Sequence, residues 1–226
     1  MAKHLLTSAL IAGVAAGVLA AILQFWLVVP LILEGELYEQ GARIHFSATG
    51  TPQSDAGHVS PWVDPLRHAG TLAMNVVTWT AFAFFLVAGF IMARRVGHEV
   101  DARKGAVWGL MAFLAVQLAP SAGLAPELPG TIAADLGARQ TWWIGCVAAS
   151  IAGIALLAFG RGVPAIAGGL ALLAAPHIIG APGVETYYGI AAPELASHFA
   201  ARSLAVAALT WVALGSIAGA LWSRQA

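Results

Sequence analysis

Charged residues are scarce in this chain of 226 residues, where they make up 10% of the sequence, against about 25% in a typical soluble domain. The eleven Lys and Arg residues balance the eleven Asp and Glu residues, so the formal net charge is zero. Apolar residues reach 59%, and the mean hydropathy is +0.80. This composition excludes a soluble globular enzyme, a disordered chain and a basic nucleic-acid-binding protein, and it leaves an integral membrane protein.

Several chemical motifs are also missing. The single cysteine, Cys146, excludes an internal disulfide and a CxxC redox or zinc site. The sequence has no GxxxxGK[ST], HExxH or GxSxG motif, which excludes a P-loop ATPase and the usual zinc-protease and serine-hydrolase signatures. We expect no enzyme activity, and the chain by itself shows no source of energy.

Six stretches without charge are long enough to cross a membrane, because a helical span needs about 20 apolar residues. We predict an all-α, polytopic bundle of six transmembrane helices in a single domain. The predicted spans lie at about 5–29, 69–93, 105–124, 141–160, 163–179 and 200–222. Only Arg161, between Gly160 and Gly162, separates the fourth span from the fifth, which predicts a tight hairpin. Five spans is the alternative, if one of these two helices is short or re-entrant.

The basic residues predict the orientation. Four of them lie in the turn at 94–104, and the positive-inside rule places this turn in the cytoplasm together with both termini. The first span exceeds the length of a signal-peptide core, so we expect it to stay uncleaved. A flexible loop at 38–67 is then external. Nine of the eleven carboxylates and five of the seven histidines also face outward.

Some polar and small residues have structural interpretations. Glycines four residues apart at Gly13/Gly17, Gly105/Gly109 and Gly215/Gly219 predict close helix packing. Gln24, inside the first span, either lines a cavity or forms a hydrogen bond across helices, and we favour the hydrogen bond.

Three outer segments follow one pattern. A helix is expected to end at a proline, a carboxylate follows, and the next helix begins with an acidic residue and a polar partner four positions later. The prolines and carboxylates are Pro30 with Glu34, Pro120 with Glu127, and Pro176 with Glu185, and the pairs that begin the next helices are Asp64/His68, Asp135/Arg139 and Glu194/His198.

Residues at i and i+4 share one helix face, so Asp64/His68 and Glu194/His198 can each offer an oxygen and a nitrogen to one cation. The alternative is that these acids only stabilise helix N-termini. His177 follows a long apolar run beside Pro176, Gly180 and Pro182, where a broken helix and an ionisable group indicate a functional site; an interfacial histidine in solvent is the alternative. The candidate metal ligands are His177, His198, Glu194, His68, Asp64, Glu185, Glu127 and Glu34, with His45 and His58 as weaker candidates.

Long strings of this sequence resemble the CbtA-type proteins, the predicted cobalt transporter subunits. They are LLTSALIAGVAAGVLAAILQ…PLILEGELYE, GAVWGLMAFLAVQLAPSAGLAPELPG, ARQTWW and PHIIGAP…PELASHFAARS. The resemblance covers nearly the whole chain apart from residues 40–66. It implies about five spans, a multi-pass protein of the bacterial inner membrane, and a small single-span, histidine-bearing CbtB partner.

The function that we expect is uptake of a divalent transition-metal ion through an external vestibule of acids and histidines. Cobalt is favoured by the resemblance, since ligand chemistry alone does not separate Co²⁺ from Ni²⁺ or Zn²⁺. Co²⁺ or Ni²⁺ is expected as cargo, with no permanently bound cofactor. A membrane-embedded metal-dependent enzyme and a non-transporting assembly subunit are the alternatives, and a homo-oligomer is left open.

Overall fold

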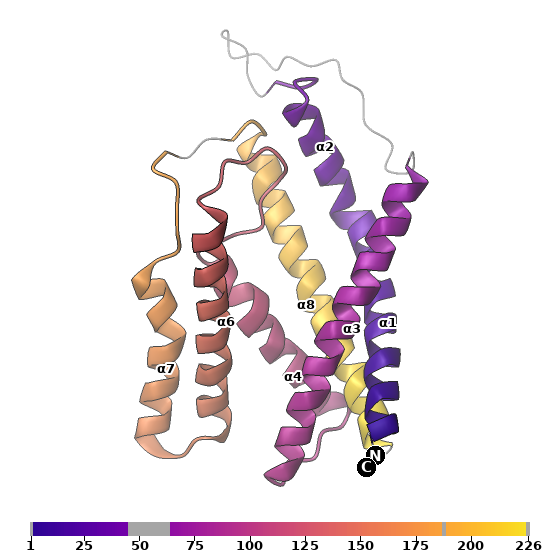
Figure 1. Cartoon of the computed structure of the whole chain (residues 1–226), viewed down its shortest axis with the longest axis vertical. Coiled ribbons are helices and arrows are strands. Elements are labelled where there is room, and N and C mark those ends of the chain that lie inside the picture. The colour runs from indigo at the N-terminus through magenta and orange to yellow at the C-terminus, as the bar shows by residue number, and fades with distance from the viewer. Residues whose placement is uncertain (1, 45–63, 187–188, 225–226) are drawn as a thin grey trace. The chain divides into compact units, whose positions relative to one another are not determined.

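A computed structural model describes residues 2–44, 64–186 and 189–224, and over these ranges every regular element is a helix (Figure 1). The helices are α1 (Ala2–Leu27), α2 (Val29–Glu39), α3 (Pro65–Arg95), α4 (Ala102–Phe113), the π-helix η1 (Leu114–Leu118), α5 (Ala119–Ser121), α6 (Leu136–Phe159), α7 (Gly162–Ile179) and α8 (Pro193–Ser223). The chain forms two compact units. The first unit contains Met1–Trp26, Trp62–Phe113 and Ala205–Ala226, and the second contains Leu27–Pro61 and Leu114–Leu204.

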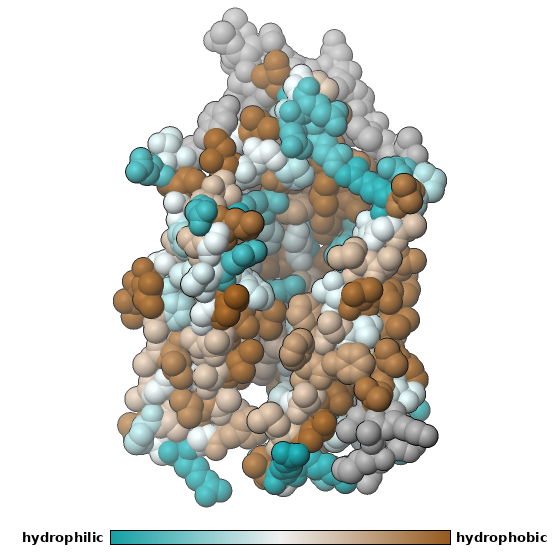
Figure 2. Space-filling view, in the orientation of Figure 1, coloured by the Kyte–Doolittle hydropathy of each residue, from teal (hydrophilic) through white to brown (hydrophobic). Residues whose placement is uncertain are grey.

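Five helices in the described part of the chain are long and apolar enough to cross a membrane: α1 from Leu6, α3, α6, α7 and α8. In hydrocarbon a backbone must satisfy its own hydrogen bonds, and a continuous helix does so. Figure 2 shows apolar residues over much of the helical surface, with hydrophilic residues mainly toward the helix ends. Ile178 and Ile179 near the end of α7 expose 82% and 80% of their surface. Such apolar exposure suits a lipid-facing helix.

The prediction of six single helices is not confirmed. The third predicted span, 105–124, falls on α4, η1 and α5, and none of these three helices reaches the length of a span by itself. By contrast, the hairpin around Arg161 is confirmed, because α6 ends at Phe159 and α7 begins at Gly162. Whether the chain has five or six spans therefore depends on α4, η1 and α5 and not on the hairpin.

The prolines do not end helices as the sequence pattern suggested. Pro30 lies in the first turn of α2 and Pro120 in the middle of α5. Pro176 lies inside α7, which continues to Ile179. A proline lacks only its own N–H, so it fits a first turn, where that N–H has no partner in the helix. Gly180 follows the last residue of α7 and has a φ of 87°, a value that favours glycine.

The predicted loop at 38–67 is shorter than expected at both ends. The helix α2 extends to Glu39, and α3 begins at Pro65. Val29, Leu31 and Leu33 of α2 are buried in the second unit, and this apolar burial explains why an acidic segment forms a helix. Residues 45–63, with His45 and His58, lie outside the described residues.

In the first unit, α1 and α3 run antiparallel with their backbones close together. A Cβ added to Gly17 would lie 2.6 Å from the Val76 Cα atom, and one added to Gly13 would overlap Thr80. Asn75 Nδ2 donates a hydrogen bond to Gln24 Oε1 at 2.8 Å. This confirms the favoured interpretation of Gln24 as a hydrogen-bond partner across helices.

Two glycine pairs meet where α4 packs antiparallel to the C-terminal half of α8, which also belongs to the first unit. The carbonyl oxygen of Gly215 lies where a side chain on Gly105 would be. The carbonyl oxygen of Trp211 lies where a side chain on Gly109 would be. Gly219 likewise meets the carbonyl of Asp101. The prediction of close packing at these glycines is confirmed.

Aromatic rings fill the remaining space between α3 and α8. Trp211 packs against Trp79 and Phe82, with ring centroids 5.3 and 4.8 Å apart. At one end of the same interface, Phe90 packs against Trp222 with ring centroids 6.2 Å apart. The contacts advance in the same direction along both helices, so α3 and α8 run parallel.

In the second unit, α6 and α7 form an antiparallel hairpin. A Cβ on Gly153 would lie 2.8 Å from the Gly169 carbonyl oxygen, so the two helices approach closely at these glycines. The short helices η1 and α5 lie against α6. This framework carries the polar segments that connect the helices of the second unit.

We predict that Gly109→Val lowers the free energy of unfolding by about 1–3 kcal/mol, because the added side chain overlaps the Trp211 carbonyl and forces α4 away from α8. The same substitution at Gly145 is the control, since nothing lies within 4 Å of a Cβ there. Thermal unfolding in detergent measures both variants. Equal stability of the two would contradict a packing role for Gly109.

Candidate functional site

The eight predicted metal ligands divide between the two units. Asp64 and His68 belong to the first unit, and the second unit contains Glu34, Glu127, His177, Glu185, Glu194 and His198. Within the ranges that the structure describes, no three His, Cys, Asp or Glu side chains are grouped so as to hold a metal ion. The ligand set therefore stays a prediction, and the contacts of each residue indicate what it can do.

Aspartates cap three helices of the chain. Asp64 Oδ1 accepts a hydrogen bond from the Arg67 N–H at 3.0 Å at the start of α3, and Asp135 accepts one from Ala138 at 2.9 Å at the start of α6. Asp101 accepts from the Lys104 N–H at 2.8 Å, and this bond holds the pKa of Asp101 below its ordinary value. The contact of Asp64 agrees with the interpretation that this residue stabilises the start of a helix.

His68 lies one turn into α3, and its ring meets the Phe25 ring edge-on with centroids 5.0 Å apart. Its backbone N–H donates to the Asp64 carbonyl at 3.2 Å. The predicted pair Asp64/His68 thus joins a capping carboxylate and a ring that packs on an aromatic side chain.

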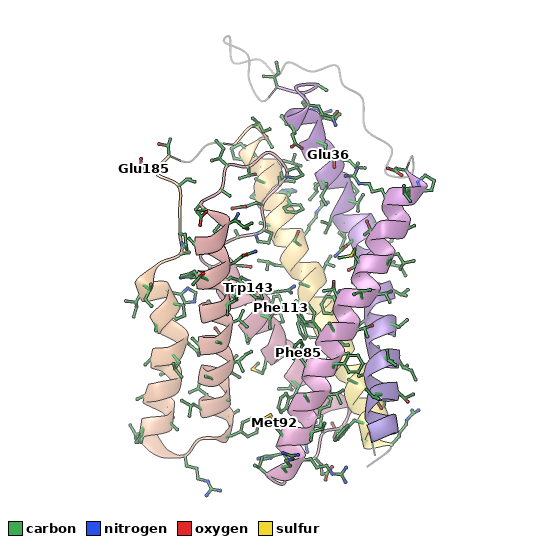
Figure 3. The ribbon with its side chains drawn as sticks, in the orientation of Figure 1. Glu36, Phe85, Met92, Phe113, Trp143 and Glu185 are labelled. Carbon is green, nitrogen blue, oxygen red and sulfur yellow. The ribbon has the colours of Figure 1, made fainter. Side chains whose placement is uncertain are left out.

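Three acid-bearing segments of the second unit come together. The first is α2, the second is residues 122–135, and the third runs from residue 189 into the start of α8. Leu128 is buried against Gly35 of α2, and a Cβ on Gly130 would touch both Ile190 and the Glu39 Cγ atom. Arg202 of α8 donates to the Leu27 carbonyl at 3.4 Å. Figure 3 shows Glu36 on α2 and Glu185 in the segment after α7.

Arginines neutralise two of the predicted ligands. Arg43 Nη1 lies 2.6 Å from Glu34 Oε1, and Arg139 Nη2 lies 2.7 Å from Glu127 Oε2. The sequence pattern paired Arg139 with Asp135, four residues earlier, but Asp135 caps α6 and Arg139 reaches back to the preceding segment. In the sequence, only the presence of two arginines in acid-rich segments pointed to these ion pairs. The spacing of residues along the chain does not define which carboxylate each arginine binds.

His177 lies in the last turn of α7, with its imidazole exposed and edge-on to Trp142 at 6.1 Å between ring centroids. Trp142 Nε1 donates to the Pro176 carbonyl at 3.1 Å, and the Gly180 N–H donates to the same oxygen at 3.0 Å. Two donors therefore fix the backbone immediately before His177, and sequence analysis did not predict this contact.

Glu194 and His198 are both exposed on the first two turns of α8, and Glu185 is exposed in the segment before it. Their spacing of four residues puts Glu194 and His198 on one face of the helix. An oxygen and a nitrogen on this face can replace two water molecules of a hydrated divalent ion.

In a comparison with known families, the model of the probable cobalt transporter subunit (CbtA) matches residues 2–223. This chain belongs to the CbtA family. The comparison with curated proteins found no match, and neither did the comparison with solved structures.

Membership of the CbtA family, together with five apolar helices, makes this a multi-pass membrane protein of a transporter-subunit family. The family description names cobalt and a subunit, and a transporter subunit is not an enzyme. The family description names no residues that bind the ion, so the candidate ligands are chosen by the chemistry of their side chains.

We predict that Trp142→Phe in this CbtA protein destabilises the α6–α7 hairpin by about 1 kcal/mol, the usual contribution of one hydrogen bond, because the Pro176 carbonyl loses a donor. Trp143→Phe is the matched control, since the neighbouring Trp143 side chain is 39% exposed and forms no such bond in the described structure. Limited proteolysis near the hairpin, at several denaturant concentrations, compares the two variants. A greater effect of Trp143→Phe would contradict the assignment.

Proposed function

We propose that this chain is the membrane subunit of an uptake system for a divalent transition-metal ion, with Co²⁺ as the cargo. The observation that carries the proposal is the meeting of three carboxylate-bearing segments within one compact unit, in a chain of a cobalt-transporter family. These segments form the external vestibule of the proposal. Clustered carboxylates raise the local concentration of cations and increase their rate of arrival.

The ligands that we propose are those with exposed donor atoms in the second unit. Glu185 and Glu194 attract the hydrated ion, and His177 and His198 replace part of its water shell. Nitrogen and oxygen ligands together suit Co²⁺, Ni²⁺ and Zn²⁺, and affinity for a given set of ligands rises from Co²⁺ to Ni²⁺. The choice of cobalt follows the family description.

The topology of the proposal has six crossings. The sixth is α4–η1–α5, a continuous helical path over residues 102–121, whose length of about 30 Å at 1.5 Å per residue matches the hydrocarbon core. The basic turn at 94–104 then lies in the cytoplasm with both termini, in accordance with the positive-inside rule. We place the chain in the bacterial inner membrane.

A partner is part of the proposal, since the family description calls CbtA a subunit. We propose a small single-span CbtB-like protein, whose histidines would take over the ion. No segment of this chain has the sequence signature of an ATP-hydrolysing motor, so the energy for uptake has to come from the ion gradient, the membrane potential or another subunit.

Cellular accumulation of radioactive Co²⁺ tests the proposal, with Ni²⁺ and Zn²⁺ as competitors and with the CbtB-like partner present or absent. We predict that His177→Ala and Glu194→Gln each reduce uptake by about tenfold or more, because each removes a group that binds the ion. His98→Ala is the matched control, since His98 lies in the turn after α3, on the cytoplasmic side of the proposed topology. Membrane levels of each variant are measured by immunoblot.

The outcomes separate the parts of the proposal. Uptake that survives His177→Ala and Glu194→Gln keeps the transport function and removes these two residues from the path. Absence of uptake with both proteins in the membrane contradicts transport itself. Loss of uptake in His98→Ala, at normal membrane levels, contradicts the orientation.

A further inference from the structure

The acids of the second unit differ in what neutralises them. Glu34 and Glu127 are each held by an arginine at 2.6 and 2.7 Å. Their side chains are 37% and 34% exposed, and those of Arg43 and Arg139 are 18% and 24% exposed. These are half-buried, charge-assisted hydrogen bonds, in which the guanidinium occupies a place that a metal cation could otherwise take.

Glu194, in the third acid-bearing segment, and Glu185, which precedes that segment, have no such arrangement. Glu185 and Glu194 are in no ion pair with any residue that the structure describes. The arginine nearest to them along the chain, Arg202, donates to a backbone carbonyl, that of Leu27. Of these four carboxylates, Glu34 and Glu127 are thus each paired with an arginine, and Glu185 and Glu194 are not.

We propose that Arg43 and Arg139 are resident counter-ions that set the order in which carboxylates bind the cargo. An arriving divalent cation first meets Glu185 and Glu194, and Glu34 and Glu127 become ligands only when the cation displaces their arginines. This inference rests on the proposed function, and it assigns the two arginines a role in specificity.

The chemistry of the groups supports this exchange. A guanidinium does not lose its proton in a protein, so Arg139 releases Glu127 only by moving away. Partly exposed ion pairs contribute little net free energy, which makes such a movement inexpensive. A divalent ion carries twice the charge of a guanidinium and competes for the carboxylate, whereas Na⁺ or K⁺ has the same charge and lacks the directional hydrogen bonds of arginine. The arginines therefore favour divalent over monovalent cargo.

Isothermal titration of the purified full-length chain in detergent with CoCl₂ tests the inference. Arg139→Gln is expected to tighten Co²⁺ binding about fivefold, which corresponds to the upper range for one exposed ion pair. Arg202→Gln changes the net charge equally and leaves both carboxylate pairs in place, so its affinity should stay within about twofold of the wild type. Arg139→Lys keeps the positive charge and should resemble the wild type.

Two further variants make the test specific. The double variant Glu127→Gln/Arg139→Gln lacks the released carboxylate, so the gain in affinity should disappear. Arg43→Gln repeats the experiment on the Arg43–Glu34 pair. If Arg139→Gln elutes as an aggregate in size-exclusion chromatography, the result for Arg43→Gln decides whether the counter-ion role holds. Titration in 300 mM KCl should weaken Co²⁺ binding to Arg139→Gln more than to the wild type.

The results distinguish this inference from the proposed function. If the wild type binds Co²⁺ and Arg139→Gln matches Arg202→Gln, the counter-ion role is wrong and the proposed function stands. If the gain persists in the double variant, the released Glu127 carboxylate is not its source and the inference is overturned. If neither the wild type nor any variant binds Co²⁺, the proposed function fails and the inference fails with it.

Discussion

Close contact between backbones is the constraint on which the first unit depends. Carbonyl oxygens of α8 lie where the side chains of Gly105 and Gly109 would be, so only glycine permits this approach. In lipid the hydrophobic effect does not drive helices together, and van der Waals contact at small residues takes its place. The same helix, α8, carries Glu194, His198 and Arg202 in its N-terminal part, which belongs to the second unit. One helix therefore packs in the first unit and carries two of the predicted ligands in the second.

The described acids divide by the way in which their charge is balanced. Asp64, Asp101 and Asp135 use theirs to cap helices, and Glu34 and Glu127 share theirs with arginines. An Asp at a helix start is held by a hydrogen bond from a backbone N–H and by the partial positive charge of the helix terminus, and a cation would have to compete with both. A carboxylate without such a partner is the better first contact for an ion. This reasoning favours Glu185 and Glu194 over Asp64 among the predicted ligands.

Long charge-free runs predicted most of the helices, because a hydrocarbon solvent admits few exceptions to apolarity. The α6–α7 hairpin and the glycine contacts followed from the sequence for the same reason. The helix α2 did not, since a segment with three glutamates can be helical when residues such as Leu31 and Leu33 are buried on one side. The partner of Arg139 was also beyond sequence reasoning, because the path of residues 122–135, and not helical spacing, brings Glu127 to it.

Two different exchanges can control one cation in the second unit. An imidazole must be neutral to bind a metal, so in the proposed function protons compete with the ion for His177 and His198. A guanidinium does not lose its proton in a protein, so the competition that we propose between the ion and Arg43 or Arg139 depends on cation charge and concentration and not on protons. In the proposed function the histidines thus couple ion binding to pH, and the arginines couple it to the charge of the cation. In the proposed order, exposed groups bind the ion first and the arginine-paired carboxylates bind it next, so the number of oxygen ligands around the ion increases.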